Sequence, residues 1–347
     1  MNRCPACGRE YADDARFCTR DGSRLLGAAV TPPRNTIAGR ADPPAALSHG
    51  NLVGRLLDGH YRILRKVGEG GMSFVYLASD VATQEQYAIK VLSASLSSDE
   101  NAMARLRREA SLGMRLAHPN VCHIIRLGET QDGLVYVVMP YLEGEVLSDR
   151  NNRLGTIPIA DVVRYVRDIA TGLHVAHELK IVHRDLKPEN VMISTVAGGG
   201  ERAVVMDFGL AKERRLDAEL QKLTATGIIL GTPEFMSPEQ LRGRPLDPRT
   251  DVYSLALMTY EMLTGKLPFS GRTQQEMMIA RLKSDPVPLR DAAPSLGLEA
   301  VERVLAKALQ RDPGDRYQSA PELATALATA AKLDGDENSR LTRFFAR

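Results

Sequence analysis

Cysteine is scarce in this sequence, which has four cysteines among 347 residues. Cys4, Cys7 and Cys18 crowd the start and Cys122 stands alone, a distribution that excludes the disulfide framework of a small secreted domain. No apolar stretch approaches the roughly 18 residues of a membrane-spanning helix. The polar start NRCPACGRE is not typical of a signal peptide. We therefore expect a soluble, cytoplasmic protein with no membrane span in this chain.

A strong excess of charge of either sign is also missing. The formal net charge is +2, so neither nucleic acid nor an anionic membrane is predicted as a partner. Hydrophobic residues make up 44% of the chain, which is enough for one large core or two modest ones.

Composition divides the chain into four parts. Residues 1–26 carry the closely spaced cysteines, and residues 27–57 are rich in proline, alanine and glycine. The second part cannot bury enough apolar surface to offset the entropy of ordering, so it is predicted to be a flexible linker. Residues 58–331 have a dense hydrophobic pattern and form the main domain, and residues 332–347 are a polar, then basic, tail.

Hydrophobic periodicity changes within the main domain. Short runs typical of strands and one helical stretch come first, at 61–67, 73–80, 86–92, 99–117 (helical), 122–130 and 134–142. After residue 156 the pattern is mainly helical. The predicted fold class is α+β, with a β-rich first lobe and an α-rich second lobe that meet near residue 142.

A glycine-rich stretch lies between the first two strand-like runs. VGEGGMSFV covers residues 67–75, and glycines let the backbone N–H groups approach phosphate oxygens closely. Alone, this pattern is more often a simple turn. The next strand carries Lys90 in YAIK, and the following helix carries Glu109. A Lys and a Glu that face each other across a cleft can direct the ammonium group at phosphates.

Two further motifs decide the interpretation. HRDLKPEN covers residues 183–190 and DFG covers residues 207–209, and GTPEFMSPE follows at 231–239. With these motifs in this order, the chain resembles the eukaryotic-like protein kinases, and in detail the bacterial Ser/Thr branch. The resemblance covers roughly residues 61–330. It implies a bilobal protein kinase fold and an ATP-dependent protein serine/threonine kinase that acts in signal transduction and phosphorylates itself.

The resemblance also implies the catalytic residues. Asp185 is expected to orient the substrate hydroxyl and accept its proton, and Asn190 and Asp207 are expected to hold Mg²⁺ (or Mn²⁺) on the ATP phosphates. The full catalytic set implied is Asp185, Lys187, Asn190, Lys90, Glu109, Asp207 and Thr232.

The implied ATP site combines the glycine-rich stretch with an adenine pocket. Met139 is the expected gatekeeper, and residues 140–142 are the expected hinge. The full set is Val67, Gly68, Glu69, Gly70, Gly71, Met72, Ser73, Phe74, Val75, Ala88, Lys90, Met139, Pro140, Tyr141, Leu142 and Met192. Ser73 stands where the motif usually has its third glycine.

Other positions have structural or regulatory roles by resemblance. Glu239 is expected to pair with Arg316, and Asp251 to brace the catalytic loop. Gly113, four residues after Glu109, is expected to leave the first helix loosely packed.

Two threonines are the predicted phosphorylation sites. Thr224 and Thr226 precede the GTPEF motif with a spacing similar to that of the autophosphorylated pair of bacterial Ser/Thr kinases.

The cysteines at the start have the spacing C-x2-C-x10-C-x2-D. Two such knuckles resemble a short zinc ribbon, which would bind Zn²⁺ through Cys4, Cys7, Cys18 and Asp21 and serve protein interaction. In the alternative interpretation, Asp21 and Gly22 form only a tight turn.

The sequence leaves several hypotheses about function open. A pseudokinase scaffold that acts through the zinc-ribbon module is the main alternative, and small-molecule phosphotransfer is a third. The protein substrate with its Ser or Thr, the activating signal and a homodimer for autophosphorylation are not determined. Nor is it determined whether SRLTRFFAR is a true C-terminus or a flank before a membrane span.

Overall fold

The computed structural model describes residues 2–3, 10–11, 52–70, 73–93, 100–196, 198–208, 233–271 and 273–331. The chain divides into two compact units, residues 1–48 and residues 49–347. In the first unit, β1 (Asn2–Arg3) pairs antiparallel with β2 (Glu10–Tyr11). The four proposed zinc ligands and the linker up to residue 51 lie outside the described residues.

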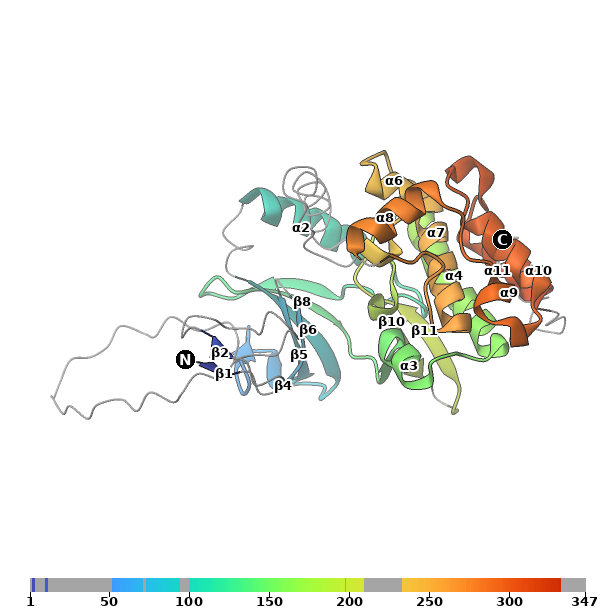
Figure 1. Cartoon of the computed structure of the whole chain (residues 1–347). Helices are drawn as coiled ribbons and strands as arrows, with labels where there is room; N and C mark the ends of the chain where they lie inside the picture. The colour runs from blue at the N-terminus through green and yellow to red at the C-terminus, as the bar shows by residue number, and fades with distance from the viewer. Residues whose placement is uncertain are drawn as a thin grey trace, which may run out of the picture. The chain divides into compact units, whose positions relative to one another are not determined.

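The second unit begins with a six-stranded sheet in the order β3-β4-β5-β6-β8-β7. Figure 1 labels β4, β5, β6 and β8 of this sheet. Its strands are β3 (Leu56–Leu57), β4 (Tyr61–Gly70), β5 (Ser73–Asp80), β6 (Gln86–Leu92), β7 (Arg126–Glu129) and β8 (Val135–Pro140). Every neighbouring pair is antiparallel. Alternate side chains form an apolar core on one face, in which Ile63, Tyr76 and Ile89 are almost fully buried.

Helix α2 (Glu100–Gly113) follows β6, the fourth strand of this lobe. Met103, Leu106 and Ala110 lie on its buried face, at the spacing of an amphipathic helix. The expectation that Gly113 loosens this helix is wrong. A Cβ atom at Gly113 would lie 2.9 Å from Cδ1 of Ile124, so the space beside the glycine is already filled.

The helical lobe starts with a small three-stranded sheet in the order β11-β10-β9. Its first elements are β9 (Gly144–Val146), α3 (Leu147–Leu154), α4 (Ile159–Glu178), η1 (Pro188–Asn190), β10 (Val191–Thr195) and β11 (Glu201–Val205). The remaining elements are η2 (Pro233–Phe235), α6 (Pro238–Leu241), α7 (Pro248–Thr264), α8 (Gln274–Lys283), α9 (Leu289–Ala292), η3 (Pro294–Leu296), α10 (Glu299–Ala308), η4 (Pro313–Asp315) and α11 (Ala320–Ala330).

Helix α7 lies at the centre of this lobe and packs against α4, α10 and α11 (Figure 1). It is buried on nearly every side, and its buried residues include the polar Thr250, Asp251 and Thr259 as well as apolar ones. Its start is fixed by Asp247, whose side chain accepts a hydrogen bond from the Arg249 N–H, with Pro248 at the first helical position. A helix held this firmly is a suitable base for side chains that must keep their positions.

Two lobes, one with the larger sheet and one mainly helical, confirm the predicted α+β bilobal architecture. Strand β8 ends at Pro140, close to the predicted boundary at residue 142. Among the described residues, no helix is long and apolar enough to cross a membrane.

Candidate active site

The glycine-rich stretch forms a hairpin between β4 and β5. Gly68 is paired with Val75, and Glu69 with Phe74. The register shifts between Lys66 and Gly68, which marks a bulge just before the turn. The turn residues Gly71 and Met72 lie outside the described residues.

Strand pairing then brings distant residues of the predicted site together. Val75 is opposite Lys90, and Ala88 is opposite both Leu77 and Met139. Val75, Ala88 and Lys90 are half-buried, and Met139 is buried. These residues therefore form one continuous patch on adjacent strands.

Lys90 reaches the helical lobe. Its Nζ atom lies 2.7 Å from Oδ1 of Asp207, and the lysine and aspartate side chains are 15% and 29% exposed. The two residues are 117 positions apart, and this ion pair joins β6 to Asp207, the second residue after the end of β11. The side chain of Glu109 is outside the described part of the chain, so its predicted contact with Lys90 stays a prediction.

The predicted catalytic loop is held by its own hydrogen bonds. Asn190 donates from Nδ2 to the backbone oxygen of Asp185 at 2.7 Å and to its Oδ2 atom at 2.9 Å. Lys187 Nζ lies 3.6 Å from the same Oδ2 atom. The backbone oxygen of Asn190 accepts from the N–H of Met206 at 2.8 Å. Because Met206 precedes Asp207, this bond places Asp207 next to Asn190 of the predicted catalytic loop.

Asp251 supports this loop from the central helix α7. The N–H groups of His183 and Arg184 donate to its two carboxylate oxygens at 2.8 and 3.0 Å, and His177 Nε2 lies 2.7 Å from Oδ2. Full burial acts to raise the pKa of Asp251. Several interactions with His177 and His183 outweigh burial and hold the pKa of Asp251 below its usual value. They are the hydrogen bond to His177, the electrostatic attraction to both histidines, and the hydrogen bond from the His183 N–H. The predicted bracing role of Asp251 is confirmed.

Two non-glycine residues of the site have left-handed backbones. Arg184 has φ 66° and Asp207 has φ 57°, a conformation that is costly for residues with a Cβ atom. Each is held by neighbours. Gln240 Nε2 donates to the Arg184 carbonyl at 2.6 Å, and the His183 ring packs edge-on against Phe208 with centroids 4.8 Å apart.

The predicted hinge and adenine pocket lie at the junction of the lobes. Pro140 is opposite Tyr87 at the end of β8, and Tyr141 and Leu142 follow outside any strand. Met192 lies on β10, opposite Val146 and Val204.

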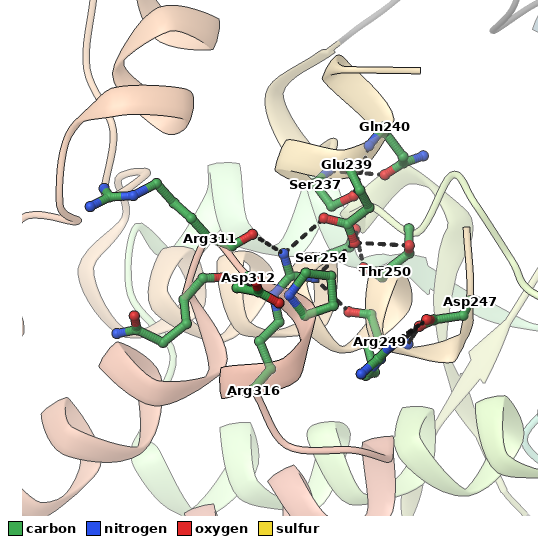
Figure 2. A network of polar contacts seen from close by, with 12 residues as sticks. Ser237, Glu239, Gln240, Asp247, Arg249, Thr250, Ser254, Arg311, Asp312 and Arg316 are labelled. Carbon is green, nitrogen blue, oxygen red and sulfur yellow. Dashed lines mark hydrogen bonds and ion pairs between the residues drawn. The ribbon is translucent and has the colours of Figure 1, made fainter. Parts of the chain in front are cut away.

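A buried ion pair anchors helix α6 in the helical lobe (Figure 2). Arg316 binds Glu239 through two hydrogen bonds of 2.8 Å, and Thr250 Oγ1 donates to the same carboxylate at 3.0 Å. Arg316 is only 2% exposed and also donates to three backbone oxygens, at Arg249, Gln310 and Arg311. Burial acts against the Glu239 charge, but the Arg316 contacts keep its pKa below the usual value. The predicted pairing of Glu239 with Arg316 is confirmed.

The sequence analysis missed two residues that support the predicted catalytic loop. His177 on α4 binds Asp251, and Gln240 on α6 holds the Arg184 carbonyl. A histidine on the apolar side of a predicted helix was the available signal for His177. No local signal marks Gln240, because its partner is 56 positions away.

Several predicted residues cannot be compared with the structure. Thr224, Thr226, Thr232 and Gly209 lie outside the described residues. Among the residues that are described, no group of three or more His, Cys, Asp or Glu side chains is placed to hold a metal ion.

The geometry agrees with comparisons to known proteins. The family model described as "Protein kinase domain" matches residues 61–327. The chain belongs to the protein kinase family. Serine/threonine-protein kinase pkn2 of Myxococcus xanthus is 40% identical over 276 residues, which are 79% of this chain and 33% of that protein. Serine/threonine-protein kinase PrkC of Bacillus subtilis is 33% identical over 291 residues, which are 84% of this chain and 43% of that protein.

Solved structures support the same fold. The PknI kinase domain of Mycobacterium tuberculosis matches this kinase domain with a TM-score of 0.61 and 28% identity, and the match covers 82% of this chain and 100% of that chain. The domain is thus a serine/threonine kinase domain of the bacterial type. The chain spans between 33% and 51% of the length of the first three curated relatives.

Proposed function

We propose that this protein transfers the γ-phosphate of ATP to Ser and Thr hydroxyls of proteins, including its own, in signal transduction. The observation that carries the proposal is the joined set of Lys90, Asp207, Asn190 and Asp185 at the meeting point of the two lobes. Phosphoryl transfer needs positioned charges more than covalent chemistry, and this set supplies an ammonium group, two carboxylates and an amide.

Each residue has a proposed task. Lys90, oriented by Glu109, binds phosphate oxygens. Its backbone is held by the pairing of β6 with β5, in which Lys90 is opposite Val75. Asp185 orients the substrate hydroxyl and accepts its proton, and Lys187 steadies the γ-phosphate. Thr232, which lies outside the described residues, is proposed to assist Asp185 and Lys187. The short distance from Lys187 to Asp185 supports their joint action.

The donor set also fits a divalent metal. Asn190 uses its amide nitrogen to bind Asp185, which leaves the amide oxygen as a ligand, and Asp207 offers carboxylate oxygens. Such hard oxygen ligands suit Mg²⁺ or Mn²⁺. A metal held there would neutralise charge on the ATP phosphates.

ATP is proposed to bind between the glycine-rich hairpin and the hinge. Val75, Ala88 and Met192 form the two faces of the adenine pocket, with Met139 behind it. Pro140 has no N–H, so the hinge contact at this position is made through its carbonyl oxygen. The residues of the hairpin from Val67 to Phe74 cover the phosphates through their N–H groups.

A radiolabel transfer assay tests the function. Full-length protein with ATP and Mg²⁺ should label itself and a protein substrate, and Asp185→Asn should lower the labelling by at least about a hundredfold, because the proton acceptor is lost. Glu299→Gln, an exposed change at the start of α10, is the matched control and should retain activity. Equal labelling by Asp185→Asn and the natural protein would contradict the proposal. Labelling by none of the proteins would favour the alternative of a pseudokinase scaffold.

We also propose that Cys4, Cys7, Cys18 and Asp21 bind Zn²⁺ and form a module for protein interaction. Support comes from the ligand spacing and from size, since so short a unit needs a staple to fold. If one copy phosphorylates another, the partner of this kinase is a second copy of the same chain, in a homodimer.

A further inference from the structure

A groove lies on the helical lobe, between helix α10 and the irregular segment Asp285–Pro288 that leads into α9. Its volume is about 200 Å³. One wall is formed by residues 302, 305 and 306, at helical spacing on α10, and continues into Leu309 and Gln310 directly after the helix. Ala306 is exposed and small, and its short side chain helps to leave the hollow open. None of the lining residues belongs to the proposed active site.

Tyr260 of the central helix α7 contributes to the floor of this groove. The residue is 2% exposed, and its hydroxyl group has no hydrogen-bond partner among the described residues. A buried hydroxyl without a partner is unfavourable and calls for an explanation. Burial, with smaller contributions from Asp291 and Glu302, raises the pKa of Tyr260 to about 12, so the phenol is neutral and keeps its proton to donate.

The charges around the groove limit the chemistry of an occupant. Glu302 already accepts two hydrogen bonds from Arg290, from its N–H and from Nη1, each 2.8 Å long. Asp285 is paired with Arg311 at 3.0 Å. Because both carboxylates are engaged, the groove offers no free charge to bind an ion. Their negative charge also disfavours an anion, so a neutral occupant fits best.

We propose that this groove binds a small neutral molecule with a compact apolar ring and a carbonyl oxygen, which accepts a hydrogen bond from the Tyr260 hydroxyl. Leu305 and Leu309 supply the apolar contact. The volume suits about one ring and a substituent, since an engineered apolar cavity of about 150 Å³ holds benzene.

The hydroxyl is itself buried, so the molecule reaches it by displacing part of the wall. The proposal assigns this movement to the segment Asp285–Pro288, which belongs to no helix or strand. A backbone hydrogen bond of 2.9 Å from the Val287 N–H to the Pro268 carbonyl is one of the bonds that hold it.

Ligand-observed fluorine NMR with para-fluorobenzamide tests the site. Full-length protein is used with saturating ADP and Mg²⁺, so that the nucleotide cleft is occupied. The Tyr260→Phe variant removes only the hydroxyl, and Ala306→Leu fills the groove from an exposed position. Ala82→Leu, in an exposed turn between β5 and β6, is the matched control. Para-fluorotoluene has the same ring without the carbonyl.

We expect para-fluorobenzamide to bind the natural protein and the Ala82→Leu variant equally. Tyr260→Phe should weaken this binding about three- to tenfold, the value of one buried hydrogen bond, and should not affect para-fluorotoluene. Ala306→Leu should weaken binding of both probes more than about tenfold. Equal binding of para-fluorobenzamide to Tyr260→Phe, no effect of Ala306→Leu, or no binding up to the solubility limit of the probe would each overturn the proposal. The melting temperature of Tyr260→Phe, expected to be equal or higher, shows that the variant is folded.

Discussion

Glu261 is a carboxyl group placed where its charge is unfavourable. It lies on the central helix α7 and accepts a hydrogen bond of 3.1 Å from Asn151. Burial raises the pKa of Glu261 to about 7, and the nearby Glu189 and Glu234 contribute in the same direction against the bond from Asn151. A protein retains such a group at a cost in stability that depends on pH.

The sign of this dependence follows from the two pKa values. The unfolded chain releases the Glu261 proton near pH 4.5, its usual value, while the folded chain retains it up to about pH 7. Between these two pH values, raising the pH favours the unfolded state, and above pH 7 the cost stays constant. Glu261→Gln should therefore stabilise the protein at pH 8 by about 1–3 kcal/mol and have almost no effect at pH 4.5.

Urea unfolding of both proteins at these two pH values measures the difference. The glutamine can still accept the bond from Asn151, and its amide can donate to Asn151 Oδ1, which has no partner among the described residues. Glu299→Gln is the control, since it makes the same chemical change at an exposed site. A gain in stability of equal size at pH 4.5 and pH 8 would refute the titration of Glu261 as its cause.

At the scale of elements, helix α4 packs unusually close to the segment before β7. A Cβ atom at Gly172 would lie 2.6 Å from the carbonyl oxygen of Asn120. That carbonyl is fixed, because it accepts from the Val205 N–H at 2.9 Å, while the Asn120 side chain donates to the Ala203 carbonyl. The glycine is thus required by the approach of two backbones and not by the helix.

Gly172→Ala should accordingly destabilise the protein by about 1–3 kcal/mol, although alanine is the better helix former by about 1 kcal/mol. Gly113→Ala is the matched control in α2. Its new Cβ would meet Cδ1, Cγ1 and Cβ of the Ile124 side chain and not a fixed backbone oxygen, so a smaller loss of stability than in Gly172→Ala is expected. Thermal or urea unfolding of the two variants makes the comparison. If both variants were stabilised, helix propensity would dominate and the close approach at Gly172 would be unimportant.

Elements differ in how well the sequence predicts them. Strands β5 and β6 match their predicted ranges, because alternating apolar residues between turn signals depend on local chemistry alone. Helix α3 was missed. Its sequence is polar and its N-cap, Val146, makes no side-chain bond. Arg150 of α3 instead bonds to Glu145 and Glu201, so that distant contacts hold the helix.

The same reasoning applies to the candidate site. Lys90, Asp185 and Asp207 were recognised by their motifs, but no motif states that the Lys90 side chain lies 2.7 Å from Asp207. The expectation about Gly113 was wrong because it considered the missing side chain and not the neighbour that fills the space. Packing partners from distant segments are the part that local sequence does not encode.

At the scale of the whole molecule, the proposed zinc module can be tested apart from the kinase. Protein purified with zinc present should contain about one metal ion per chain by mass spectrometry of the metal. Cys7→Ser should remove the metal, because three remaining ligands bind zinc weakly. Cys122→Ser is the matched control, since Cys122 lies in the second unit and near the Pro140 carbonyl. Unchanged metal content in Cys7→Ser would exclude the site.

Regulation by phosphorylation also involves the whole molecule, and we predict it for Thr224 and Thr226. A phosphate adds nearly two negative charges and strong acceptors, which can order a segment against cationic side chains. Arg184 is suitably placed, because its backbone N–H is fixed to Asp251 and it directly precedes Asp185. A phosphate bound there would connect the segment before GTPEF to the proposed catalytic loop.

The double variant Thr224→Ala/Thr226→Ala should therefore lose most of its activity toward a protein substrate, by about tenfold or more, while remaining folded. Mass spectrometry after incubation with ATP and Mg²⁺ should find phosphate on one or both threonines of the natural protein. Thr325→Ala/Thr329→Ala, a pair on helix α11, is the control and should keep full activity. The outcome that rules out this switch is full activity in a double variant with no phosphate anywhere in residues 213–232. In that case the hydrogen bonds that Asp251 and Gln240 make with Arg184 would suffice to hold the catalytic loop for catalysis.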